Sequence, residues 1–141
     1  MTINCDTPPK NRQVKVLVLD DEPIILMGLR HTLKNAGFNA IGARTCKKAL
    51  EAIEESVPDV AILDVNLAIE TCEEVAHRLH TLEVPFVLHT GDLERHGELV
   101  TRLGAPILAK PAFPDIIVQV VLNLSRGSTG TDQDETDAEE Q

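Results

Sequence analysis

The sequence contains no tryptophan or tyrosine, and aromatic residues make up only 2% of its 141 residues. Proteins that bind single-stranded nucleic acid stack bases on aromatic side chains, so this class of function is disfavoured. The formal net charge of -10 also disfavours a surface that binds DNA or an anionic membrane. We therefore expect neither a nucleic acid nor a membrane among the partners of this protein.

Cysteines and long apolar runs are also scarce. Cys5, Cys46 and Cys72 are odd in number and form no CxxC pair, which argues against a disulfide framework or a zinc site. The first ten residues lack the charged and apolar regions of a signal peptide. No apolar stretch approaches the roughly 18 residues that a membrane-spanning helix needs. These absences predict a soluble, cytoplasmic protein with reduced thiols.

Apolar residues make up 43% of the sequence, which is close to the globular norm, and the length suffices for one domain with a hydrophobic core. The negative charge is concentrated near the end. Residues 126–141 hold six acids and one base, whereas residues 1–125 hold 17 acids and 12 bases. We expect a polar leader over 1–12, a single domain over 13–125 and an acidic, disordered tail over 126–141.

Short apolar runs alternate with amphipathic segments along the domain. Five runs rich in Val, Ile and Leu predict buried strands, and each is followed by a segment with apolar residues at helical spacing. Continuous apolar strands are typical of a parallel sheet covered on both faces. The sequence therefore predicts an α/β fold, with a doubly wound, five-stranded parallel sheet and five helices. The predicted strands are 14–19, 38–41, 60–63, 85–89 and 106–109, and the helices begin near Pro23, Thr45, Thr71, Leu93 and Pro114.

Charged or hydroxyl residues stand at the carboxyl ends of four of the five predicted strands. Because ligands bind at this edge of an open parallel sheet, we expect these residues to form a site. Two carboxylates about 5 Å apart repel by about 3 kcal/mol at an effective dielectric near 20. A hard divalent cation offsets such repulsion, and oxygen ligands favour Mg²⁺ over Zn²⁺. The residues are Asp20, Asp21, Asp64, Thr90 and Lys110.

This set of residues suits phosphoryl transfer. With a metal bound, one carboxylate can attack phosphorus as a nucleophile. The metal and Lys110 would neutralise the transferring phosphoryl oxygens, and Thr90 would donate its hydroxyl to one of them. Simpler explanations exist for each residue alone: Asp20 and Asp21 could cap the following helix, and Asp64 could be a turn residue. Their joint occurrence favours the chemical interpretation.

The motifs LVLDDEP, AILDVNL, LHTGD and LAKP, in this order, resemble the receiver domains of bacterial two-component response regulators, and the resemblance covers residues 14–124. It implies the flavodoxin-like receiver fold. It also implies that Asp64 is the phosphoacceptor, that Thr90 is the switch hydroxyl and that Lys110 senses the phosphate. The Mg²⁺ ligands that it implies are Asp21, Asp64, Asp20 through a metal-bound water, and the backbone carbonyl of Asn66.

Some residues near the predicted pocket depart from the family pattern or add to it. Ile107 stands where the family often has Tyr or Phe, so signalling through burial of an aromatic ring is not expected. Asn66 and Asp92 each lie two residues beyond an active-site residue, where polar side chains could speed hydrolysis of the phosphorylated aspartate; ordinary loop polarity is the alternative. His89 precedes Thr90, and we expect it in the core or near the pocket, with at most a modest pH effect on the site.

The resemblance predicts a single-domain response regulator that is not an enzyme. A sensor histidine kinase or histidine phosphotransfer protein would phosphorylate Asp64, with Mg²⁺ as cofactor. Phosphorylation would then switch a surface between about Leu93 and Leu124 that binds a downstream protein. A phosphorelay intermediate or a phosphate sink fits the same residues. The alternatives from other classes are a degenerate receiver that acts as a constitutive interaction module, and an aspartyl-phosphate phosphatase, which typically has a DxD motif and a cap domain.

Overall fold

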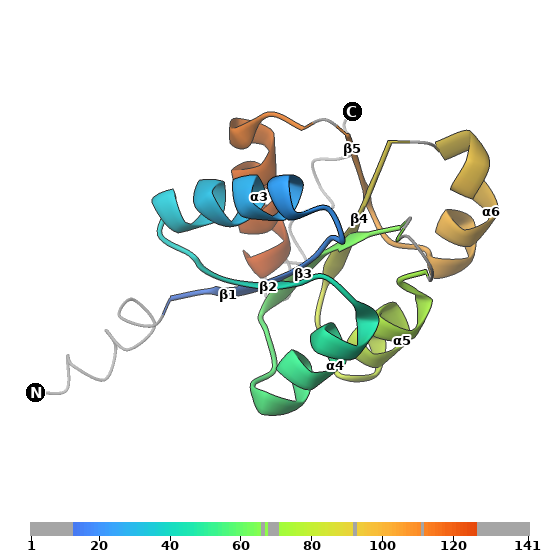
Figure 1. Ribbon diagram of the computed structural model, residues 1–141, viewed down its shortest axis with the longest axis horizontal. Helices are drawn as coiled ribbons and strands as arrows, with labels where there is room; N and C mark the ends of the chain where they lie inside the picture. The colour runs from blue at the N-terminus through green and yellow to red at the C-terminus, as the bar shows by residue number, and fades with distance from the viewer. Residues whose placement is uncertain (1–12, 66, 68–70, 92, 111, 127–141) are drawn as a thin grey trace, which may run out of the picture.

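The computed structural model describes residues 13–126 except 66, 68–70, 92 and 111, and in helix α6 it leaves out the side chains of 93–96. Strands and helices alternate along the chain (Figure 1). None of the described helices has the length and apolar character to cross a membrane. The elements are β1 (Lys15–Leu19), α3 (Pro23–Asn35), β2 (Asn39–Ala43), α4 (Cys46–Glu55), β3 (Val60–Asp64), α5 (Glu73–Thr81), β4 (Phe86–Thr90), α6 (Leu93–Leu103) and β5 (Ile107–Ala109).

A fifth helix spans 114–126 and is called the C-terminal helix below. The five strands form one parallel sheet in the order β2-β1-β3-β4-β5. This architecture confirms the predicted α/β fold with a doubly wound five-stranded parallel sheet and five helices. The strand order changes direction between β1 and β3, and ligands bind at the carboxyl edge of such a switch point.

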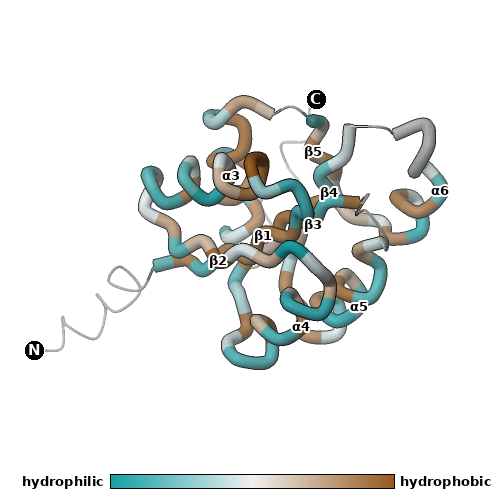
Figure 2. Tube along the Cα trace, in the orientation of Figure 1, coloured by the Kyte–Doolittle hydropathy of each residue, from teal (hydrophilic) through white to brown (hydrophobic). Residues whose placement is uncertain are grey.

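Each face of the sheet carries its own apolar cluster. Val16 and Val18 of β1 pack with α3 and the C-terminal helix, on what we call the α3 face. Leu17 and Leu19 pack with α4 and α5 on the opposite face, because successive strand residues point in opposite directions. Figure 2 shows the result: hydrophobic strands lie at the centre, and hydrophilic segments face outward on the helices. Burial on both faces explains the continuous apolar runs in the sequence.

Local sequence signals set where the helices begin and end. Pro23 lies in the first turn of α3, where its missing N–H is not needed. After α3 the chain reverses at Gly37, whose φ of +96° favours glycine, and the Gly37 N–H donates to the Lys34 carbonyl at 3.0 Å. Thr45 caps α4 by accepting a hydrogen bond from the Lys48 N–H at 3.1 Å. Short connections of this kind hold the strand ends in fixed positions.

Cys46 and Cys72 are both buried. Burial, and secondarily the neighbouring Cys46, raise the pKa of the Cys72 thiol to about 12. A thiol with such a pKa stays protonated at neutral pH and reacts poorly with oxidants. Cys72 therefore belongs to the core.

Candidate functional site

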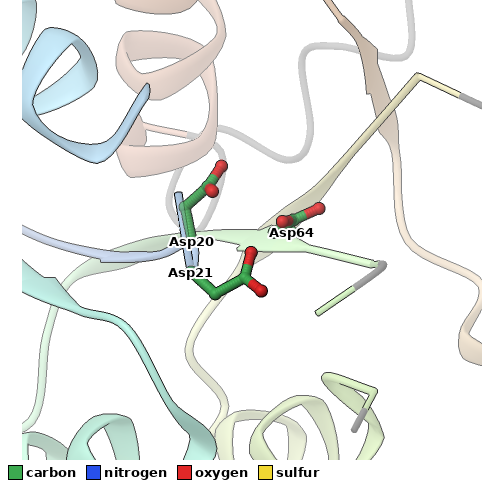
Figure 3. A group of neighbouring side chains, drawn as sticks. All are labelled: Asp20, Asp21 and Asp64. Atoms are coloured by element: carbon green, nitrogen blue, oxygen red, sulfur yellow. The ribbon is translucent and has the colours of Figure 1, made fainter. Parts of the chain in front are cut away.

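Three aspartates lie together at the carboxyl edge of the sheet. Asp20 and Asp21 follow β1, and Asp64 is the last residue of β3, the strand paired with β1 (Figure 3). One carboxylate oxygen of each lies within 4.8 Å of the other two. Asp20 and Asp64 are buried and Asp21 is half-buried. The structure thus brings together the three carboxylates that the sequence singled out.

The pleat of the strands explains which polar side chains share a face. Val60 and Ile62 of β3 pack on the α3 face, so Asp64, two residues further on, continues on that face. The same two-residue spacing applies at the ends of β1, β4 and β5. It places Asp20, His89 and Lys110 on the α3 face, two residues after Val18, Val87 and Leu108 respectively.

Lys110 is the cation of this cluster. Its Nζ donates a hydrogen bond to Asp64 Oδ1 at 3.1 Å and lies 3.6 Å from Asp20 Oδ2. Burial lowers the pKa of Lys110, but the attraction of Asp64 and Asp20 outweighs burial, and the pKa lies above its usual value. Lys110 therefore stays charged and offsets one of the three carboxylates.

Thr90 ends β4 and is 3% exposed. It pairs in register with Ala109, and its carbonyl accepts a hydrogen bond from the Lys110 N–H at 2.9 Å. These contacts place Thr90 beside the strand end that carries Lys110. Asn66 and Asp92, the two other residues singled out near the pocket, lie outside the described residues.

Neither of the two aspartates after β1 occupies the N-cap position of α3. The N-cap of this helix is Glu22, which makes no side-chain capping hydrogen bond. Instead, Asp20 Oδ1 accepts a hydrogen bond from the Glu22 N–H at 2.9 Å, which fixes the turn out of β1. Asp20 Oδ2 is buried without a hydrogen-bond partner among the described residues and faces the Lys110 ammonium. The N-cap position of α3 is thus occupied by Glu22, and the Asp20 side chain serves the turn that precedes the helix.

The cluster fits a hard divalent cation. Three carboxylates beside one ammonium leave excess negative charge in a largely buried site. Mg²⁺ prefers oxygen ligands, and the buried Asp20 Oδ2 offers an oxygen without a hydrogen bond. In the described part of the chain, no histidine or cysteine joins the group that could hold a metal. Asp20, Asp21 and Asp64 are therefore better suited to Mg²⁺ than to Zn²⁺.

Two further residues lie near the cluster. His89 is 4% exposed, as expected for a core position, and neither ring nitrogen has a hydrogen-bond partner among the described residues. Burial, and secondarily the charge of Lys110, lower the pKa of His89 to about 4. Arg44 donates a hydrogen bond to the Asp21 carbonyl at 3.4 Å. No sequence motif marks Arg44, because only the fold brings it to a residue 23 positions away.

Known proteins similar to this chain are receivers and regulators. The profile of the response regulator receiver domain matches residues 16–122. The transcriptional activator protein ExaE of Pseudomonas putida is 27% identical over 125 residues, which cover 84% of this chain and 58% of ExaE. The alkaline phosphatase synthesis regulatory protein PhoP of Bacillus subtilis is 33% identical over 106 residues, or 71% of this chain and 43% of PhoP. The chain thus spans about half the length of these relatives.

A solved structure agrees with the sequence comparison. The chemotaxis protein CheY4 of Vibrio cholerae matches with a TM-score of 0.72 at 25% identity, over 80% of this chain and 99% of CheY4. Receiver domains bind Mg²⁺ at an acidic pocket, interact with histidine kinases or phosphotransfer proteins, and are generally signalling modules rather than enzymes. From the profile match over most of its length, together with the five-stranded fold, this chain belongs to the response regulator receiver domain family of two-component signalling.

Proposed function

We propose that this chain is a response regulator receiver that accepts a phosphoryl group on Asp64 and thereby switches a protein-binding surface. The observation that carries this proposal is the position of Asp64 beside the Lys110 ammonium and two more carboxylates. A carboxylate in such a setting can act as a nucleophile toward phosphorus once the surrounding charge is balanced. Membership of the receiver family supports the same conclusion.

In the proposed step, a carboxylate oxygen of Asp64 attacks the phosphorus of a phosphohistidine on a sensor histidine kinase or phosphotransfer protein. An O–P bond forms as the N–P bond breaks, and the released imidazole takes up a proton. Lys110, which lies 3.1 Å from Asp64 Oδ1, is suited to neutralise a phosphoryl oxygen. We assign to the Thr90 hydroxyl a hydrogen bond to another phosphoryl oxygen. A bound Mg²⁺ supplies further charge neutralisation.

The reaction can be tested with acetyl phosphate and Mg²⁺ in place of the unidentified phosphodonor. Wild type should gain one phosphoryl group by intact-protein mass spectrometry, and Asp64→Asn should gain none because the nucleophilic oxygen is lost. Asp115→Asn, which changes an exposed aspartate, is the matched control and should label as wild type does. Equal labelling of Asp64→Asn and wild type would refute the proposal.

The same assay separates the two alternatives. Release of many equivalents of phosphate per chain, with the signal lost in Asp64→Asn, indicates an aspartyl-phosphate phosphatase. A wild-type chain that gains no phosphoryl group under any of these conditions is a degenerate receiver, and its partner contacts are then independent of phosphorylation.

We assign the metal ligands to Asp20, Asp21 and Asp64, with the backbone carbonyl of Asn66 completing the protein ligands. A cation that binds only the folded chain stabilises it, by about 2.7 kcal/mol at 100 times its Kd. We therefore expect Mg²⁺ to raise the free energy of unfolding of wild type, measured by urea unfolding with MgCl₂ against EDTA. Asp21→Asn should lose most of this increment because it removes a charged ligand at nearly constant size.

Glu51→Gln is the control for general charge effects, since Glu51 is exposed on α4. Its Mg²⁺ increment should equal that of wild type. The assignment fails if Asp21→Asn keeps the full increment.

Exposed apolar side chains beside the cluster support a docking place for the phosphodonor. Ile24 and Met27 lie in α3 just after the aspartates, and Phe113 lies three residues after Lys110. Their exposures are 79%, 64% and 75%. Large apolar side chains that are exposed near a reactive site are candidates for a partner contact, so we assign these residues to the phosphodonor contact.

The downstream protein is assigned to the segment from about Leu93 to Leu124, which includes Phe113 and so overlaps the phosphodonor contact there. Ile107, at the start of β5, is exposed there in place of an aromatic residue. Output must then depend on shifts of the backbone and of aliphatic side chains. A two-state equilibrium of this kind responds to phosphorylation only through differential stabilisation of the active state.

We place the protein in the cytoplasm, with the receiver domain at 13–125 between the polar leader (1–12) and the acidic tail (126–141). The buried thiols of Cys46 and Cys72 suit a reducing compartment. The net charge of -10 supports a protein partner rather than a nucleic acid or an anionic membrane.

A further inference from the structure

A positively charged groove runs along α3 and the edge strand β2. Its volume is about 540 Å³. No acid is found among the described residues that line it, and the lining combines basic side chains with an apolar floor. The cationic residues are Arg30, Lys34 and Arg44, His31 lies among them, and Met27 and Phe38 contribute apolar surface.

Basic and acidic residues are unevenly distributed along the chain. Residues 23–48, which form α3, β2 and the first turn of α4, hold five bases and no acid. The rest of the chain holds eight bases and all 23 acids. Arg30, Lys34 and Arg44 line the groove, whereas Lys47 and Lys48 belong to α4 on the opposite face of the sheet. The groove therefore gathers three cations with no acid among its described lining residues, which favours the binding of an anionic partner.

Two of the cations are positioned by the fold. A Cβ at residue 42 would lie 2.9 Å from Arg30 Cδ, so Gly42 allows the arginine side chain to lie against β2. Arg44 is held at the other end of β2 by its hydrogen bond to the Asp21 carbonyl. Cations held in place lose less conformational entropy when an anion binds.

We propose that this groove binds the acidic end of the same chain, residues 127–141. That segment holds six acids and no base, so its charge complements the groove. Its 15 residues reach about 50 Å when extended, whereas the 13 residues of α3 span about 20 Å, so the acids can lie along the whole groove. The acids are Asp132, Asp134, Glu135, Asp137, Glu139 and Glu140.

The described chain ends where this segment can enter the groove. The C-terminal helix packs with α3 on one face of the sheet (Figure 1). It follows β5 and runs back across the sheet, so residue 126 lies toward the edge at which β1 and β2 begin. Lys34 and Asn39 line the groove near that edge. A tether of this length gives an effective concentration of about millimolar, so weak electrostatic attraction fills the groove.

Docking of residues 127–141 has a consequence for the phosphodonor. Met27 belongs both to the groove and to the exposed apolar surface assigned above to the phosphodonor. A docked acidic segment covers part of that surface and competes with the phosphodonor for it. This consequence rests on the proposed function, whereas the docking itself does not.

Paramagnetic relaxation enhancement tests the docking in the full chain. A spin label is attached through Ala138→Cys in a chain that carries Cys5→Ser, since Cys46 and Cys72 are buried. The label should broaden amide signals of α3 and β2 severalfold more than those of α5 on the opposite face. Raising the ionic strength from about 0.01 M to about 1 M shortens the Debye length from about 30 Å to about 3 Å and should abolish the difference.

Two variants and one mixed sample make the test specific. Arg30→Gln/Lys34→Gln should remove the broadening, whereas Lys47→Gln/Lys48→Gln, an equal charge change on exposed residues of α4, should retain most of it.

A mixture of spin-labelled chain and ¹⁵N chain without a spin label should show no broadening. Broadening in the mixed sample means that a second copy fills the groove, and it overturns the proposal. So does an absence of broadening at α3 and β2, or broadening that survives Arg30→Gln/Lys34→Gln. No phosphoryl transfer is needed, so failure here leaves the proposed function intact.

Discussion

Replacing Lys110 with methionine is expected to lower the free energy of unfolding by about 3 kcal/mol at pH 7 without divalent cations. Methionine keeps the apolar length of the side chain and removes only the charge. The carboxylates of Asp20 and Asp64 then remain buried without their cation, which lies 3.6 Å and 3.1 Å from them in wild type. The side chain of Lys110 is 21% exposed, so we expect the low end of the range for broken buried ion pairs.

Urea unfolding in EDTA measures this loss, and Lys48→Met is the matched control. Lys48 is 70% exposed and lies 4.0 Å from Glu51, so its replacement should change stability by less than about 0.5 kcal/mol. Adding Asp20→Asn to Lys110→Met should restore part of the loss because it removes one uncompensated carboxylate. If Lys110→Met costs no more than Lys48→Met, the cluster is solvated and the electrostatic account of the site is wrong.

The gathering of the polar site residues at one edge of the sheet could be predicted, because it depends on local sequence patterns. Apolar runs end in polar residues, and parallel strands bring their carboxyl ends to one edge. The register of the strands could not be predicted from one sequence. Leu19 pairs with Leu63, so the next residues, Asp20 and Asp64, come to lie side by side. A shift of one residue would send one of these carboxylates to the opposite face of the sheet.

Contacts between segments that are distant in the sequence could not be predicted from it either. The sequence shows Arg44 only as a base after an apolar run, and its bond to the Asp21 carbonyl depends on the pairing of β1 with β2. The charge segregation is visible as a segment without acids, but the groove that it lines requires α3 to pack beside β2. The sequence predicts His89 in the core or near the pocket, and its burial agrees with this, whereas its proximity to Lys110 follows from the period of the strands and their parallel order.

His89 should make stability depend on pH. Its pKa is about 4 in the folded chain against 6.5 in the unfolded chain, chiefly because burial disfavours the charged ring. The unfolded chain therefore binds more protons between these values, and stability rises with pH from about 4 to about 6.5 and then levels off. A shift of this size corresponds to about 3 kcal/mol across the window. Asp64, the register partner of His89, and Lys110 are the neighbouring charged groups.

Comparison with His89→Leu isolates this contribution. The titration of the aspartate cluster is common to both proteins and largely cancels in the difference between them. At pH 7 the two should differ by no more than about 1 kcal/mol, because leucine removes two ring nitrogens that lack hydrogen bonds among the described residues. At pH 4 the variant should be the more stable, with the difference shifted in its favour by about 3 kcal/mol. If the free energies of unfolding of the two proteins depend on pH in the same way, the pKa of His89 is equal in the folded and unfolded chains and the prediction is wrong.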